Sequence, residues 1–128
     1  MSLDLMVVMK ERLSKDLKSK VHSLLIKERF KKEKNGYYPT DGHISLDIYY
    51  STVKDIQWYW RDSALLKDLG FMPKAEVNLE SRHTEKSHLT SYRLARKIAT
   101  LTDGTIYDPQ VGEFYDYVCI HSGITNEA

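Results

Sequence analysis

Hydrophobic and polar positions alternate along two short segments of the chain, and a period of two predicts strands that bury one face. The first segment covers residues 43–51 and the second covers residues 75–81. The apolar positions are Ile44, Leu46, Ile48 and Tyr50 in the first, and Ala75, Val77 and Leu79 in the second. These two strands are expected to pack their apolar faces against helices.

A helical period dominates residues 3–33, where apolar residues recur every three or four positions. The stripe consists of Met6, Met9, Leu13, Leu17, Val21 and Leu24. We therefore expect one long N-terminal helix that ends at Asn35-Gly36. Such a helix would be about 45 Å long, which is longer than a compact domain of this size is wide. A homodimer formed through residues 3–33 would bury the part of this helix that extends beyond the domain.

Two further helices follow from capping residues and stop signals. Ser51 or Thr52 is expected to cap a helix that carries Ile56 and Trp60, and Gly70 ends this region. A turn signal at Asp62-Ser63 leaves open whether the region is one kinked helix or two short ones. Thr84 or Ser87 is expected to cap a second helix, whose apolar face includes Leu94, Ala95, Ile98 and Leu101. Gly104 follows this helix and is expected to be its left-handed terminal residue.

The remaining segments predict a linker and a hairpin. Residues 37–42 contain Pro39 and Asp41-Gly42, which favour a turn. A strand at residues 105–107, a turn at Asp108-Pro109 and a return strand over residues 113–120 form the predicted hairpin.

The order of these elements from Ile44 onward matches most of a ferredoxin-like plan. We expect an α+β fold with a mainly antiparallel four-stranded sheet and helices on one face, preceded by the long N-terminal helix. The domain organisation is then a basic amphipathic helix over residues 1–36, an α+β domain over residues 37–121 and a flexible tail over residues 122–128.

Charge is distributed unevenly along the 128 residues. Residues 1–34 hold ten Lys/Arg and five Asp/Glu, and the rest of the chain holds nine and thirteen. The basic helix either meets an anionic partner or lies on its own acidic domain, and the second interpretation is favoured. Its cations alternate with Glu11, Asp16 and Glu28, which disfavours nucleic-acid binding.

The sequence predicts neither a secreted nor a membrane protein. Cys119 is the only cysteine, so no disulfide forms within the chain. No run of about 18 apolar residues is present, and no signal-peptide pattern precedes the domain. The cytoplasm is the expected compartment. The native start, at Met1, Met6 or Met9, is left open.

Residues that often carry chemistry are present, but not in patterns typical of a site. Cys119, His121, His43, His83 and His88 lack the spacing of zinc ligands, and Cys119 in an apolar run favours a packed thiol over a nucleophile. The carboxylates near the hairpin suit turn chemistry better than acid–base catalysis; they are Asp103, Asp108, Glu113 and Asp116. We expect no catalytic residue, no metal and no cofactor.

Consecutive aromatic residues give the strongest functional hypothesis. Trp58, Tyr59 and Trp60 lie about 100° apart around a helix, so they cannot all face one core. With Arg61 beside them, they are typical of a protein-binding hot spot. We predict a non-enzymatic binding protein that docks its partner on these four residues, and the acidic remainder of the chain suits a basic partner.

Two other functions are weighed against protein binding. The first is a small-molecule sensor or small enzyme that uses a cleft between sheet and helix, near Tyr49, Asp108 and Tyr115. The second is nucleic-acid binding through the N-terminal helix, which would depend steeply on salt.

The segment ATLTDGTIYDPQVG (residues 99–112) resembles a helix–glycine–strand segment of small bacterial α+β proteins. Some of these proteins are similar to immunity proteins that pair with toxins. The resemblance covers residues 94–112, and the order of elements extends it to residues 44–118. It implies an immunity or regulatory role and carries no catalytic residue onto this chain.

Overall fold

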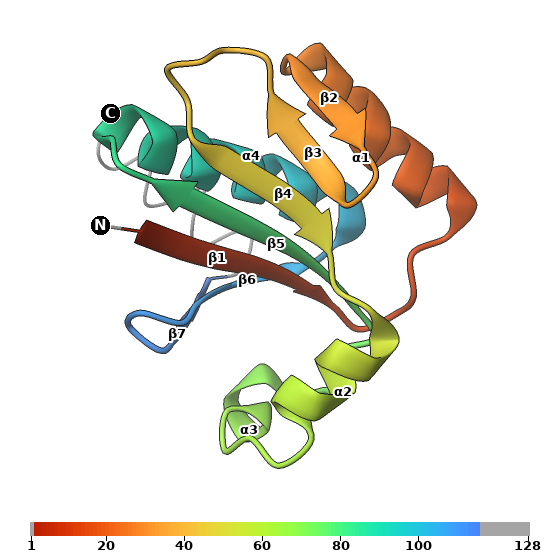
Figure 1. The fold of residues 1–128 in the computed structure, drawn as a ribbon. Coiled ribbons are helices and arrows are strands. Elements are labelled where there is room, and N and C mark those ends of the chain that lie inside the picture. Colours follow the sequence, from red (N-terminus) through yellow and green to blue (C-terminus); the bar gives the residue numbers. More distant parts are fainter. Residues whose placement is uncertain (1, 116–128) are drawn as a thin grey trace.

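Seven antiparallel strands form one sheet in this computed structural model, which describes residues 2–115. The strand order is β2-β3-β4-β5-β1-β6-β7 (Figure 1). The strands are β1 (Ser2–Met9), β2 (Phe30–Glu33), β3 (Gly36–Pro39), β4 (Leu46–Tyr50), β5 (Ala75–Arg82), β6 (Thr105–Asp108) and β7 (Glu113–Tyr115). The helices are α1 (Lys15–Lys27), α2 (Val53–Trp60), α3 (Leu66–Leu69) and α4 (Glu85–Thr102).

The predicted long N-terminal helix is wrong, because residues 2–9 form β1 between β5 and β6. Met6 and Met9, which a helix would place on one side, belong to hydrophobic clusters on opposite faces of the sheet. A strand buried on both faces reads as a continuous apolar run, and such a run also satisfies a helical period. Only α1, capped by Ser14, has the predicted conformation.

The predicted four-stranded sheet is also wrong. The segment expected to be a linker contains β3, which forms a hairpin with β2, and Tyr37 is buried there. The hairpin extends the sheet beyond β4, and β1 joins its centre. The helical period concealed β1 and β2, and the turn signals of Pro39 and Asp41-Gly42 concealed β3.

One face of the sheet is covered by α1 and α4, which lie behind the strands in Figure 1. The main core lies between these helices and the sheet. It includes Leu46 and Ile48 of β4, Val77 and Leu79 of β5, and Leu94, Ala95 and Ile98 of α4. The predicted inward faces of both alternating segments are therefore confirmed, and so is that of the last helix except at Leu101, which is exposed.

The opposite face is covered only in part, by α2 and α3 at one end of the strands (Figure 1). A second cluster forms there around Trp60, with Val8, Ile56 and Tyr107 buried beside it. The sheet thus has a closed face and a face on which strands β4, β5 and β1 are only partly covered.

Capping residues bear out the predicted helix starts, and one predicted stop is corrected. Thr52 and Thr84 accept hydrogen bonds from Asp55 N and Ser87 N as N-caps of α2 and α4. The left-handed residue after α4 is Asp103, with φ 54°, and not Gly104. Glycine is required at 104 because a Cβ there would lie 2.7 Å from Val7 Cγ1. Close helix–strand approach, and not backbone handedness, selects it.

Candidate functional site

The aromatic run on α2 divides between the core and the surface. Trp58 is 80% exposed, Tyr59 is 40% exposed and Trp60 is fully buried. Arg61, just past the helix, is also exposed and pairs loosely with Asp62 at 3.5 Å. The expectation that at least one ring would be exposed therefore holds for Trp58.

Trp60 fixes the position of α2 on the sheet. Its ring lies 5.3 Å from Tyr107 and 6.2 Å from Phe114, centroid to centroid. Its indole N–H donates to Glu76 Oε1 at 3.2 Å, and Ser51 Oγ donates to Glu76 Oε2. The buried carboxylate of Glu76 thus joins both ends of α2 to β5. Trp58 is consequently displayed on a helix that has little freedom to rotate.

Two shallow hollows lie beside α2 and share Gln57 and Met72. One, of about 510 Å³, is lined by Lys54, Gln57, Trp58, Arg61 and Met72. The other, of about 480 Å³, is lined by Glu11, Arg12, Val53, Ile56, Gln57, Met72, Pro73 and Lys74. We call the two together the α2 groove. The groove offers a surface beside Trp58 on which a partner side chain can be buried.

The α2 groove is positively charged, contrary to the expectation of a basic partner. Four positively charged side chains line it, namely Arg12, Lys54, Arg61 and Lys74, against one carboxylate, that of Glu11. An acidic partner surface is therefore complementary at this place, because opposite charges steer association and fix the docked orientation.

Tyr59 contributes less to the groove than the sequence suggested. Its ring packs edge-on against Trp60 at 5.1 Å. Burial, and next the neighbouring Tyr107, raise the pKa of Tyr59 to about 12. Tyr59 therefore stays neutral at physiological pH and belongs mainly to the contact between α2 and the sheet.

The residues of the predicted cleft are not brought together in the structure. Tyr49 lies on the partly covered face, where its hydroxyl donates to Glu80 at 2.6 Å. Asp108 is buried on the face that α4 covers, near Tyr92, whose pKa is raised by burial and by Asp108. Tyr115 belongs to β7 and pairs with Ile106. Since Tyr49 and Asp108 face opposite sides of the sheet, a single cleft does not join them.

Within residues 2–115, no group of three or more His, Cys, Asp or Glu residues is arranged to hold a metal ion. His88 Nδ1 lies 2.8 Å from Ser81 Oγ, and His43 follows a turn closed by Asp41. Cys119 and His121 lie outside the described residues.

Within residues 2–115, no helix is both long and apolar enough to cross a bilayer.

The cations predicted to line one helix are divided among several elements. Lys15, Lys18, Lys20 and Lys27 belong to α1, whereas Lys31 and Lys32 lie on β2 at the edge of the sheet. Lysines on an edge strand oppose pairing with another sheet. Nucleic-acid binding and homodimer formation were both predicted from a single long basic helix over residues 3–33. This segment instead contains β1, α1 and β2, so neither prediction keeps its structural basis.

Three carboxylates form a row across the partly covered face of the sheet, which we call the acidic row. Asp4, Glu80 and Asp47 are direct cross-strand neighbours on β1, β5 and β4. Like charges in this position destabilise a sheet. Burial, and next the charge of Glu80, raise the pKa of Asp4. The bond from Tyr49 and an ion pair with Arg82 at 3.5 Å partly offset the charge of Glu80.

We expect Asp4→Asn to stabilise the protein at pH 7 by about 0.5 kcal/mol, because it removes one repelling charge from the row. A carboxyl whose pKa is raised by folding penalises the folded state only when it is ionised. The advantage of the variant should therefore disappear as the pH falls through the raised pKa toward 3.8. Urea unfolding at pH 7 and pH 4 measures it, with the exposed Asp62→Asn as control. Equal gains for both variants would contradict this account.

Sequence reasoning missed the residues that complete the α2 groove. Met72, Pro73 and Lys74 follow α3, and Arg12 precedes α1, so no local pattern associates them with Trp58. Lys54 could have been found from the sequence, because it lies four residues before Trp58 and therefore on the same side of the helix.

No family model matches this chain, and none of the curated proteins and none of the solved structures matches it significantly.

Proposed function

We propose that this protein is a non-enzymatic binding protein that acts in the cytoplasm and docks a partner protein in the α2 groove. The observation that carries the proposal is the 80% exposure of Trp58 on a helix held by the buried Trp60. Exposed apolar side chains that gather on one surface, as Trp58 and Met72 do, mark interaction sites. Tryptophan, tyrosine and arginine are the residues most enriched in hot spots.

The lining of the α2 groove indicates which chemical groups a partner would present to it. Trp58 and Met72 supply apolar contact, while Lys54 and Arg61 supply positive charge beside them. A partner segment that presents an apolar side chain flanked by Asp or Glu complements this arrangement. An immunity or regulatory role is the narrower form of the proposal, and its support is the resemblance of residues 94–112.

We expect Trp58→Ala to weaken partner binding by at least about tenfold while the fold stays intact, because truncating a hot-spot residue typically costs about 2 kcal/mol or more. The measurement is affinity capture from a native lysate of the source organism, with quantitative mass spectrometry of wild type and variant. Leu89→Ala is the matched control, since Leu89 is a 60% exposed apolar residue on α4.

The partner is the protein that wild type and Leu89→Ala recover equally and Trp58→Ala loses. Arg61→Ala should reduce the same protein, and its binding should weaken with added salt. If wild type and Trp58→Ala recover the same proteins in the same amounts, protein docking at α2 is wrong.

A further inference from the structure

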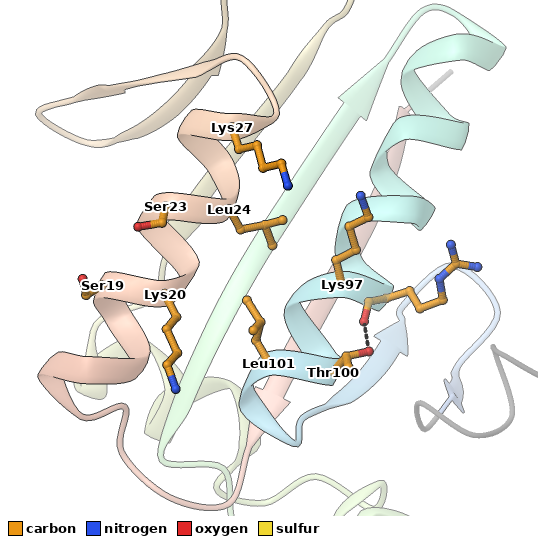
Figure 2. A pocket seen from close by; sticks show the side chains of 9 residues that line it. Ser19, Lys20, Ser23, Leu24, Lys27, Lys97, Thr100 and Leu101 are labelled. Atoms are coloured by element: carbon orange, nitrogen blue, oxygen red, sulfur yellow. Dashed lines mark hydrogen bonds between the residues drawn. The ribbon is translucent and has the colours of Figure 1, made fainter.

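A second groove lies on the opposite side of the molecule, between α1 and α4 (Figure 2). Its volume is about 570 Å³, within the range of small-molecule sites. Its lining residues are Ser19, Lys20, Ser23, Leu24, Lys27, Arg96, Lys97, Thr100 and Leu101. We call it the α1–α4 groove. It shares no residue with the α2 groove, so it is a separate site.

The middle of the α1–α4 groove is apolar. Leu24 of α1 and Leu101 of α4 point toward each other across the gap in Figure 2. Leu101 is 36% exposed, although the other face of α4 is fully buried. Leu24 packs on the main core from its inner side. Together the two leucines form an apolar strip that an aliphatic chain would shield from water.

Ammonium groups surround this strip. Lys27 extends from α1 toward the gap between the helices, and Lys97 of α4 lies at the same end of the groove, where it pairs with Glu28 (Figure 2). Lys20 extends toward the opposite end of α1, where it pairs with Asp16. Ser19 and Ser23 belong to the same lining and carry hydroxyl groups, whereas the hydroxyl of Thr100 already donates to Arg96 O at 2.8 Å. The groove therefore combines an apolar centre with groups that donate hydrogen bonds to an anion.

Carboxylates at the groove neutralise only part of its positive charge. Asp16 pairs with Lys20 at 3.3 Å, and Glu28 pairs with both Lys97 and Arg93 at 2.7 Å. Within residues 2–115, Lys27 and Arg96 have no ion-pair partner. The groove therefore has surplus charge for an anion that carries more than one negative charge.

Glu28 also holds one wall of the groove in place. Its side chain is 16% exposed and lies just after the last turn of α1, between that helix and α4. Burial works against its charge, but the bonds from Lys97 and Arg93 outweigh burial and lower the pKa of Glu28. Glu28 stays ionised at neutral pH, so the ammonium of Lys97 is fixed at the rim before any ligand arrives.

We propose that the α1–α4 groove binds a soluble phosphate monoester that carries a short aliphatic chain. The dianionic phosphate lies between Lys27 and Lys97 at one end of the groove, where charge-assisted hydrogen bonds are strongest. The chain lies on Leu24 and Leu101. This binding site is independent of partner docking on α2, and either proposal can fail without the other.

Octyl phosphate, used below the concentration at which it forms micelles, is the probe. Isothermal titration and backbone amide NMR shifts measure its binding to the full chain. We expect it to bind at least tenfold more tightly than inorganic phosphate or 1-octanol, with shifts concentrated on residues 19–27 and 96–101. Equal affinity for octyl phosphate and 1-octanol would overturn the proposal, because the charged rim would then contribute nothing.

Variants separate the two halves of the groove. Lys27→Gln should weaken octyl phosphate binding about fivefold and Leu101→Ser about tenfold, with the circular dichroism spectrum unchanged. The controls are Lys67→Gln on α3 and Leu89→Ser on α4, both at exposed positions outside the groove. Groove variants that lose no more affinity than these controls refute the site.

Vesicles test whether the phosphate belongs to a lipid. We expect phosphatidylcholine vesicles containing phosphatidic acid to bind the protein no better than phosphatidylcholine alone at physiological salt. Vesicle binding that Lys27→Gln abolishes, without binding of soluble octyl phosphate, would replace the proposed ligand with a membrane surface and overturn the proposal as stated.

Discussion

Trp60→Ala should lower the free energy of unfolding by about 4 kcal/mol, a value within the usual range for truncating a buried tryptophan to alanine. The side chain is fully buried and contacts Tyr107 and Phe114 across the end of the sheet. Its loss leaves a large cavity under α2. It also removes the indole N–H that Glu76 accepts, so a buried carboxylate loses a partner.

The two tryptophans of this chain form an internal comparison. Trp58→Ala should change stability by less than about 0.5 kcal/mol, as substitutions of exposed residues usually do. Trp60→Phe keeps a ring in the core but not the bond to Glu76, and we expect a loss of about 1–2 kcal/mol. Urea unfolding followed by circular dichroism measures all three. Similar losses for Trp58→Ala and Trp60→Ala would contradict the assignment of one ring to the surface and one to the core.

Gly36→Ala should destabilise the protein by about 3 kcal/mol, at the upper end for an added methyl group because the contacted atom is backbone. A Cβ at position 36 would stand 2.6 Å from the carbonyl oxygen of Ile48 on β4. The β2-β3 hairpin would have to move away from the sheet. Its paired register with β4 is short, since Tyr37 opposite Ile48 is the pair that joins them.

Gly42→Ala is the control for this prediction, because no heavy atom lies within 4 Å of a Cβ at position 42. We expect it to change stability by less than about 0.5 kcal/mol. Urea unfolding gives both values, and amide hydrogen exchange should report opening of residues 30–39 in Gly36→Ala first. If Gly36→Ala is as stable as Gly42→Ala, the close approach of β3 to β4 is not as tight as the structure has it.

Strands β4 and β5 and helices α2 and α4 were predictable because each carries a clean period and a boundary signal. β4 and β5 have one face in the main core and alternate accordingly. α2 and α4 begin at threonine caps and end at left-handed residues or turns. Local physical chemistry is sufficient for such segments, because the buried face and the boundary are both present in adjacent residues.

The N-terminal segment was not predictable in the same way. Residues 5–9 of β1 lie between α4 on one face and the Trp60 cluster on the other, so they are apolar on both sides and lose the alternation of a strand. Gly36 and Gly104 were interpreted as helix stops, whereas each is needed where another strand approaches closely. Contacts with residues distant in the sequence decide these positions.

The candidate sites also depend partly on local sequence and partly on contacts between residues distant in the sequence. The sequence by itself determined that three consecutive aromatic residues on a helix cannot all be buried, because their directions differ by about 100° per residue. Which ring is exposed depends on the side of α2 that meets Tyr107 and Glu76, and only the tertiary structure decides that. The same holds for both grooves, whose charged linings come from segments that no local pattern connects.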